Sequence, residues 1–361
     1  ANISDVDAEG LPSWNFKRIQ LRSKYINRKF KRDTTSTGLV DMLQDVMYVA
    51  TVTIGTPPRI FDVVIDTGSA DLWIPDSSCV GTGCSGKHTF AANYSLSYGG
   101  DGGSWQITYV DQSGASGVTS SETVIVGGFI LKNQKFARAT RMNDGFQGLP
   151  ADGIIGLAGP QDAVIPGTVT PIQNMKNQGY ITSRSFGVWL GKSSNGGSGE
   201  ITFGGFDPSH IDGNLTTIPL ASRSFDSVGI WVVQMNQISV GSRVFFLGPK
   251  EGFTVVDTGT SLIAAPTIIA DQINKLFNGT FSAQAQAYIL DCNAKLPDLS
   301  FSFGNASFTV PGADLVVDAG QGLCISAILP IDIGGGLSFL VGDTFLKSNY
   351  AYFDLDSSSI G

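Results

Sequence analysis

Residues 64–75 read VIDTGSADLWIP, an apolar run that ends in a carboxylate, Asp66, and then turns at glycine. Residues 255–266 read VVDTGTSLIAAP and repeat the pattern around a second aspartate, Asp257. A single aspartate in this position is commonly a turn cap, because its carboxylate accepts hydrogen bonds from nearby backbone N–H groups. A repeated pattern calls for another explanation.

A second element accompanies each copy. Residues 151–159, ADGIIGLAG, and residues 338–346, SFLVGDTFL, each place an apolar pair before a glycine, at a similar distance after the first and the second aspartate. The same elements in the same order predict duplicated halves. Between them the chain reads as short strands separated by Gly, Asn and Pro, with helices expected at 170–178 and 266–277. The expected fold is mostly β, with two pseudo-symmetric lobes and a cleft between them.

Pseudo-symmetry would place Asp66 opposite Asp257 where the lobes meet. Two carboxyl groups a hydrogen bond apart cannot both ionise cheaply, so they share one proton and their apparent pKa values separate. The ionised carboxylate can activate a water, while the protonated carboxyl hydrogen-bonds a substrate carbonyl. Glycines allow close approach, and neighbouring hydroxyls can hold the two turns and the outer carboxylate oxygens. The supporting residues are Thr67, Gly68, Ser69, Thr258, Gly259 and Thr260.

The composition is that of a folded protein from an oxidising compartment. The chain has 361 residues, 42% hydrophobic and 15% charged, and no apolar run reaches the ~18 residues that a membrane helix needs. Four cysteines and two histidines do not make an ordinary zinc set, so we expect disulfides instead. N-x-S/T sequons agree with a secretory route. The glycosylation candidates are Asn93, Asn214, Asn278 and Asn305.

These motifs resemble those of the pepsin family (A1) of aspartic endopeptidases over nearly the whole chain. FDVVIDTGSADLWIP, DGIIGLA, FTVVDTGTSLIAAP and FLVGDTFLKSNYAYFDLDSSSIG stand in the family's order and spacing. The resemblance implies a bilobal acid-protease fold and a hydrolase of internal peptide bonds that needs no metal or cofactor. Asp66 and Asp257 would be its catalytic pair. Activity at acidic pH, large apolar residues around the scissile bond and inhibition by pepstatin-like compounds are further expectations.

The resemblance also implies a β-hairpin flap over the substrate, which we place at 107–117, ITYVDQSGASG. Its tyrosine would be Tyr109, whose phenol would bond the indole of Trp73. Tyr98 is the rival candidate, because a glycine follows it as one usually follows the flap tyrosine. We prefer Tyr109, since the sequence after it continues the family pattern.

Several features are typical of fungal members of the family. Asp111 fits the fungal version of the hairpin and would let the S1 subsite accept Lys beside large apolar side chains. Val110 and Gln112 stand where glycines are usual, which predicts a bulkier and stiffer flap tip. The short third disulfide of vertebrate members is absent. The pairs that the resemblance implies are Cys79–Cys84 and Cys292–Cys324.

Residues 14–32 hold eight Lys and Arg and no acidic residue, although the chain has a net charge of −8. Such an arm can bind a nucleic acid or a membrane surface, but the rest of this chain is its nearest large anion. SKYI around Lys24 resembles the SKYF of pepsinogen prosegments, so Lys24 would sit between the catalytic carboxylates and Tyr25 would block a subsite. Acid would release this lysine by protonating the carboxylates. KFKR, which ends in Lys31 and Arg32, resembles a dibasic processing site, so self-cleavage and a processing protease both stay open.

The expected organisation is an inhibitory prosegment at 1–32, an N-terminal lobe at 33–208 with the first Asp-Thr-Gly and the flap, and a C-terminal lobe at 209–361 with the second. The expected partners are protein or peptide substrates, the chain's own prosegment and pepstatin-like inhibitors. We expect a monomer with no nucleic acid and no membrane span, secreted or in a vacuole or lysosome-like compartment. The alternative is a catalytically silent pepsin-like protein that binds or inhibits. The two intact Asp-Thr-Gly motifs of this chain argue against that alternative.

Overall fold

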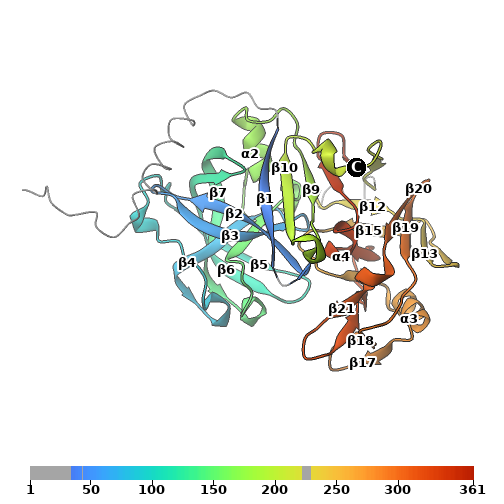
Figure 1. Cartoon of the computed structure of the whole chain (residues 1–361). Helices are drawn as coiled ribbons and strands as arrows, with labels where there is room; N and C mark the ends of the chain where they lie inside the picture. Colours follow the sequence, from blue (N-terminus) through green and yellow to red (C-terminus); the bar gives the residue numbers. More distant parts are fainter. Residues whose placement is uncertain (1–33, 43, 222–228) are drawn as a thin grey trace, which may run out of the picture. The chain divides into compact units, whose positions relative to one another are not determined.

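The computed structural model describes residues 34–42, 44–221 and 229–361, and in these ranges the chain is mainly β-strand (Figure 1). The described residues belong to one compact unit. Among the helices of the described ranges, none is long and apolar enough to cross a bilayer. Outside the described residues lie the predicted prosegment positions Lys24, Tyr25, Lys31 and Arg32.

The first half of the described chain is coloured from blue to yellow-green in Figure 1. Its strands are β1 (Thr35–Met42), β2 (Met47–Ile54), β3 (Arg59–Asp66), β4 (Leu72–Val80), β5 (Asp101–Thr108), β6 (Gly114–Val126), β7 (Phe129–Met142), β8 (Gly153–Gly156), β9 (Ser185–Trp189) and β10 (Ser198–Phe203). Its helices are α2 (Pro171–Asn177) and the 3-10 turns η1 (Thr82–Cys84), η2 (Ala92–Tyr94), η3 (Asp144–Phe146), η4 (Pro160–Asp162), η5 (Ser193–Asn195) and η6 (Pro208–His210).

The second half consists of shorter strands and runs from yellow to red in the same view. These strands are β11 (Ile218–Pro219), β12 (Val232–Gln234), β13 (Gln237–Val240), β14 (Arg243–Phe246), β15 (Phe253–Val256), β16 (Ile263–Ala265), β17 (Thr280–Ser282), β18 (Ala287–Leu290), β19 (Leu299–Phe303), β20 (Ala306–Val310), β21 (Val316–Asp318), β22 (Cys324–Ser326), β23 (Ile328–Pro330), β24 (Phe339–Val341), β25 (Ala351–Asp354) and β26 (Ser359–Ile360). The helices are α3 (Thr267–Leu276), α4 (Asp343–Leu346) and η7 (Gly312–Leu315).

The described strands form one large sheet and three small ones. The large sheet has the order β11-β26-β25-β9-β10-β1-β2-β3-β8-β4-β7-β6-β5. The small sheets are β12-β15-β24-β16-β23, β14-β13-β19-β20 and β17-β18-β22-β21. Strand β25, near the end of the chain, pairs antiparallel with β9, so the large sheet takes strands from both sides of residue 208. The boundary between the lobes at this residue therefore remains a prediction.

Local sequence accounts for many of these elements. In β19 the apolar residues Leu299, Phe301 and Phe303 are buried, while the serines between them are partly exposed, as the two-residue period of a strand requires. The predicted helices at 170–178 and 266–277 are observed as α2 and α3. Helix α2 begins with a proline, whose fixed φ suits the first helical position.

A buried aromatic group connects the large sheet to the loop beside Asp66. Phe186 of β9 and Phe353 of β25 stack with their ring centroids 5.0 Å apart, and Trp231 packs edge-on against both rings. The indole Nε1 of Trp231 donates to the carbonyl of Leu157 at 3.1 Å, and the backbone N of Leu157 donates to the carbonyl of Asp66 at 2.7 Å. The core thus fixes the backbone on which the first aspartate stands.

Candidate active site

Each Asp-Thr-Gly turn leaves the end of a strand and crosses a glycine of a neighbouring strand. Asp66 ends β3 and pairs with Gly156 of the parallel strand β8. A Cβ on Gly156 would lie 2.4 Å from the backbone of the loop after Asp66. In the second half Asp257 follows β15, which runs parallel to β24, and a Cβ on Gly342 would lie 1.9 Å from the carbonyl oxygen of Thr260. The two apolar-apolar-Gly motifs therefore serve the same purpose, because only glycine lets the turn pass.

Reciprocal hydrogen bonds join the two turns. The backbone N of Thr67 donates to the hydroxyl of Thr258 at 3.1 Å, and the backbone N of Thr258 donates to the hydroxyl of Thr67 at 3.0 Å. Each hydroxyl donates in turn to a carbonyl of the opposite strand: Thr67 to Val256 at 2.9 Å and Thr258 to Ile65 at 2.8 Å. All four bonds are buried, so the two turns hold one another with near two-fold symmetry.

The carboxylates of Asp66 and Asp257 have matching surroundings. Oδ1 of Asp66 accepts from the backbone N of Gly68 at 2.8 Å, and Oδ1 of Asp257 accepts from the backbone N of Gly259 at the same distance. Their Oδ2 atoms accept from hydroxyls, Asp66 from Ser69 and Asp257 from Thr260 at 2.7 Å. The two aspartates are only 4% and 6% exposed.

The glycines of the turns make room for the opposite carboxyl group. A Cβ on Gly68 would lie 2.8 Å from the carboxylate atoms of Asp257, and a Cβ on Gly259 would lie 2.3 Å from Oδ1 of Asp66. Any side chain at either position would push the carboxylates apart. Each carboxylate therefore lies against the turn that carries the other, and the structure brings Asp66 and Asp257 together.

The electrostatics of the pair favour a shared proton. Burial raises the pKa of Asp66 well above its ordinary range, and the charge of Asp257 raises it further. The hydrogen bond from Ser69 opposes this rise, whereas hydrogen bonding with Asp257 adds to it. A pair of this kind keeps one proton at a pH where two separate carboxyl groups would both be ionised.

The segment predicted as the flap forms the hairpin of β5 and β6, called the flap below, and Tyr109 follows β5 directly. The indole Nε1 of Trp73 donates to the phenol oxygen of Tyr109 at 2.8 Å, the contact that the family resemblance implies. Phe146 packs edge-on against both rings. Tyr98 lies elsewhere, with its hydroxyl bonded to Asp101. Burial raises the pKa of Tyr109 well above its ordinary range, and the nearby charge of Asp66 acts in the same direction.

The tip of the flap has unusual backbone geometry. Gln112 has a φ of +68°, a conformation that favours glycine, at a position where the family pattern has glycine. Val110 is 66% exposed, and the carboxylate of Asp111 accepts from the backbone N of Ser113 at 2.9 Å. The carboxylate of Asp111 is thus bonded within its own turn.

Asn143, which the sequence reasoning missed, holds the flap tip from the end of β7. Its side-chain oxygen accepts from the backbone N of Gly114 at 3.0 Å, and its amide donates to the carbonyl of Gln112 at 2.9 Å. No motif marks this asparagine, because its partners come from another strand. The signal was only that an Asn follows a long strand.

Two acidic residues near the pair were also missed. Asp71 is buried and accepts from the indole of Trp105 at 2.9 Å and from the backbone N atoms of Val164 and Ile165 at 3.2 Å each. Asp162 ends η4; burial raises its pKa to about 7, and the charges of Asp71 and Asp257 act in the same direction. The available signal was that Asp71 lies inside the quoted stretch VIDTGSADLWIP and that Asp162 follows the quoted stretch ADGIIGLAG by three residues.

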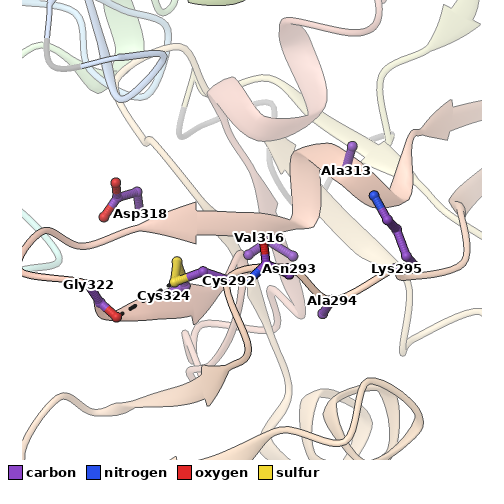
Figure 2. A pocket seen from close by; sticks show the side chains of 9 residues that line it. All are labelled: Cys292, Asn293, Ala294, Lys295, Ala313, Val316, Asp318, Gly322 and Cys324. Carbon is purple, nitrogen blue, oxygen red and sulfur yellow. Dashed lines mark hydrogen bonds between the residues drawn. A yellow bond between two sulfur atoms is a disulfide. The ribbon is translucent and has the colours of Figure 1, made fainter.

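The remaining predicted residues lie away from the pair. The disulfides are Cys79–Cys84 and Cys292–Cys324, as the resemblance implied. The second borders a pocket of about 530 Å³, and Figure 2 shows Asp318 and Lys295 at opposite ends of it. None of the predicted catalytic or flap residues lines this pocket. Exposed side chains are found at all the sequon positions, Asn93, Asn214, Asn278 and Asn305.

Comparison with known proteins shows which family has sequences similar to this chain. The family model of eukaryotic aspartyl proteases matches residues 47–361. Rhizopuspepsin of Rhizopus chinensis is 35% identical over 339 residues, 90% of this chain and 83% of that protein. Syncephapepsin of Syncephalastrum racemosum is 35% identical over 341 residues, 93% and 82% of the two chains. A probable vacuolar protease A of Trichophyton verrucosum is 35% identical over 330 residues, which cover 90% of this chain and 80% of that protein.

The chain therefore belongs to the family of eukaryotic aspartyl proteases. It is an aspartic endopeptidase, a hydrolase of pepsin type, on the mostly β, bilobal fold that the sequence predicted. The family indicated by the two Asp-Thr-Gly motifs is confirmed.

Proposed function

We propose that the protein is an acid endopeptidase made as a zymogen, with Asp66 and Asp257 as its catalytic pair. The observation that carries the proposal is the matched environment of the two carboxyl groups, each bonded to a glycine N–H and a hydroxyl of its own turn. Each also lies against the glycine of the opposite turn.

The reaction follows from one proton shared by two carboxyl groups. The ionised carboxylate takes a proton from a water between the pair, and the water oxygen forms a bond to the carbonyl carbon of the peptide. The protonated carboxyl gives its proton to the carbonyl oxygen, which leaves a neutral tetrahedral diol. The carboxyl group that took the proton from the water then passes a proton to the amide nitrogen, while the other carboxylate takes one from a hydroxyl of the diol. The C–N bond breaks, giving a carboxylic acid and an amine, and the pair again holds one proton and one charge.

The hydroxyls of Ser69 and Thr260 would hold the outer carboxylate oxygens, so that the inner oxygens face the water. The phenol of Tyr109, held by Trp73, would close the flap over the substrate. We assign large apolar side chains to the subsites around the scissile bond, and Asp111 to an S1 subsite that also accepts Lys. For Asp111 to do this, it must exchange its bond to Ser113 for one to the substrate.

The basic segment 1–32 is proposed as the inhibitory prosegment. Lys24 would place its ammonium group between the two carboxylates and favour the ionised form of both, which displaces the water. Tyr25 would fill a subsite, and cleavage after Lys31 and Arg32 would release the enzyme. Acid would begin activation by protonating the carboxylates, because the lysine then loses its counter-charges.

We assign the enzyme to the secretory pathway, either secreted or vacuolar, as a monomer. Two disulfides and exposed sequon asparagines support this route. The similarity to a probable vacuolar protease A supports the vacuolar branch. Its partners would be protein or peptide substrates, its own prosegment and pepstatin-like inhibitors.

Acidification of the purified chain tests the proposal. At about pH 4, where paired carboxyl groups titrate, we expect cleavage near Arg32 and digestion of a denatured protein that pepstatin blocks. Asp66→Asn and Asp257→Asn should each lower the turnover number at least about 1,000-fold. The matched control is Asp144→Asn, an exposed aspartate on η3, which should retain full activity.

Two outcomes would contradict the proposal. One is a chain that stays inactive after residues 1–32 are removed. The other is an Asp257→Asn variant that still digests the substrate. Faster autoconversion of Lys24→Ala than of the unaltered chain at about pH 6 is the result expected of an inhibitory lysine.

A further inference from the structure

A cluster of metal-ligating side chains lies outside the catalytic pair. Glu200 of β10, Asp207 before η6 and His210 within η6 place one ligand atom each within 4.8 Å of one another. All three side chains are half-buried. We propose that these three residues form a binding site for a divalent first-row transition cation, with zinc as the preferred ion.

Strand register explains why the three residues converge. Glu200 pairs directly with Trp189 of β9 in the antiparallel ladder. The ring of His210 stacks on the indole of Trp189, with centroids 4.1 Å apart and planes 13° apart. The ring of Tyr350 lies nearly parallel to the imidazole, and the centroids of these two rings are 6.1 Å apart. The imidazole is thus held against the strand that faces Glu200.

The two carboxylates are also oriented by hydrogen bonds. The carboxylate of Asp207 accepts from the backbone N of Ser209 at 2.8 Å, and that of Glu200 accepts from the hydroxyl of Thr202 at 3.0 Å. Supporting contacts of this kind are typical of metal ligands, since they fix the orientation of the group that binds.

The charges of the cluster are not neutralised by the described part of the chain. There, neither Glu200 nor Asp207 forms a salt bridge with Lys or Arg. Two carboxylates beside an imidazole form a site for a cation that accepts both oxygen and nitrogen ligands.

The donor set selects the class of ion. An imidazole suits zinc, cobalt and nickel, whereas magnesium and calcium prefer oxygen ligands alone. Two ligand atoms that are each about 2.1 Å from one zinc ion lie at most about 4.2 Å apart. The half-buried carboxylates need only a small side-chain rotation to close on the ion, and water would complete the coordination.

A cation here would hold the segment that follows β10 against the large sheet. Strand β9 pairs with β10 on one side and with β25, which follows Tyr350, on the other. Residue Asp207 also donates its backbone N to the phenol oxygen of Tyr350 at 3.0 Å. The ion would therefore fix the segment after β10, which leads into the second half, to the sheet that both halves share. Its role would be structural rather than catalytic.

Titration of the chelator-treated, untagged chain tests the site. Calorimetry with zinc chloride at about pH 7.5, where imidazole ligands are unprotonated, should give one site. Glu200→Gln, Asp207→Asn and His210→Gln should each weaken binding at least about tenfold. Glu200→Gln and Asp207→Asn keep the shape of the side chain, and melting curves in chelator will show that all three variants fold. Magnesium and calcium should not compete.

Cobalt provides a readout specific to the position. Bound Co²⁺ should quench the fluorescence of Trp189, because this indole contacts the imidazole ligand. Trp189→Phe should lose that quenching and still bind the ion. His88→Gln is the matched control, since it removes the other histidine, which is 72% exposed and bonded to Asp152. It should bind zinc like the unaltered chain.

Three results would overturn the inference. The first is the absence of stoichiometric zinc binding by the unaltered chain. The second is unchanged affinity in the Glu200→Gln, Asp207→Asn and His210→Gln variants. The third is loss of binding in the His88→Gln variant. The proposal does not depend on proteolytic activity, so it stands or fails independently of the catalytic pair.

Discussion

At the scale of single residues, burial decides what a carboxyl group can do. Asp66 and Asp257 share their site, and Asp71 is fully bonded to an indole and two backbone N–H groups. Asp162 differs from these, because none of the hydrogen bonds found among the described residues reaches its carboxylate. Its pKa of about 7 makes it the group in this neighbourhood that changes charge near neutrality.

Asp162→Asn should stabilise the protein at neutral pH and leave it unchanged in acid. The pKa of Asp162 is raised from 3.8 to about 7 in the folded state, so its stabilising contribution is complete below pH 3.8 and is lost as the pH rises through 7. The variant avoids this loss, and we expect a gain on the order of 2 kcal/mol at about pH 7.5, allowing for solvent screening.

Urea unfolding of the unaltered chain and of Asp162→Asn at about pH 3.5 and about pH 7.5 measures the effect. The control is Asp144→Asn, whose aspartate is exposed. An equal difference between variant and unaltered chain at both pH values would show that Asp162 does not titrate in this range.

At the scale of elements, the flap depends on a residue from a neighbouring strand. The hairpin of β5 and β6 carries Tyr109 to Trp73, but its tip holds a non-glycine residue at a positive φ. The side chain of Asn143 bridges Gln112 and Gly114 across that tip. Local strain is thus stabilised by hydrogen bonds that come from outside the hairpin.

Asn143→Ala should loosen the flap. It removes three side-chain hydrogen bonds, two of them to the flap tip and one from the backbone N of Gly145, which costs about 1–2 kcal/mol of unfolding free energy. We expect kcat/KM for a peptide substrate to fall severalfold. Asn143→Asp keeps the acceptor for Gly114 and loses the donor to Gln112, so its effect should be intermediate. Steady-state kinetics and urea unfolding of the three proteins provide the measurement. Equal kcat/KM in all three would refute a role for Asn143 in the flap.

At the scale of the whole molecule, the two disulfides constrain loops of very different length. Cys79 and Cys84 are separated by 5 residues, whereas Cys292 and Cys324 are separated by 32. The chain-entropy model gives more stabilisation for the longer loop, because the cross-link removes more freedom from the unfolded chain.

Replacing both cysteines of the long loop by alanine should therefore cost more than replacing both of the short loop. The model gives about 4 kcal/mol for Cys292 with Cys324 and about 2 kcal/mol for Cys79 with Cys84. Urea unfolding of the two double variants compares them directly. The entropic explanation fails if the short-loop variant is the less stable of the two.

The sequence alone determined the class of fold and the identity of the catalytic candidates. Repetition made this possible: Asp66 and Asp257 stand in near-identical motifs, and each motif is followed by its own apolar-apolar-Gly element. Periodicity and prolines also indicated where α2 and α3 lie. Information of this kind is local, or is copied within the chain, so it can be read without coordinates.

Only the tertiary structure decided which distant groups meet. Asn143 bonds the flap, Asp162 faces the charges of Asp71 and Asp257, and His210 stacks beside Glu200 through strand pairing. None of these contacts has a sequence motif, because each joins segments whose separation depends on how the strands are ordered. The physical reason is that burial and proximity set a carboxyl group's pKa and a histidine's ligands, and both arise only when the sheets assemble.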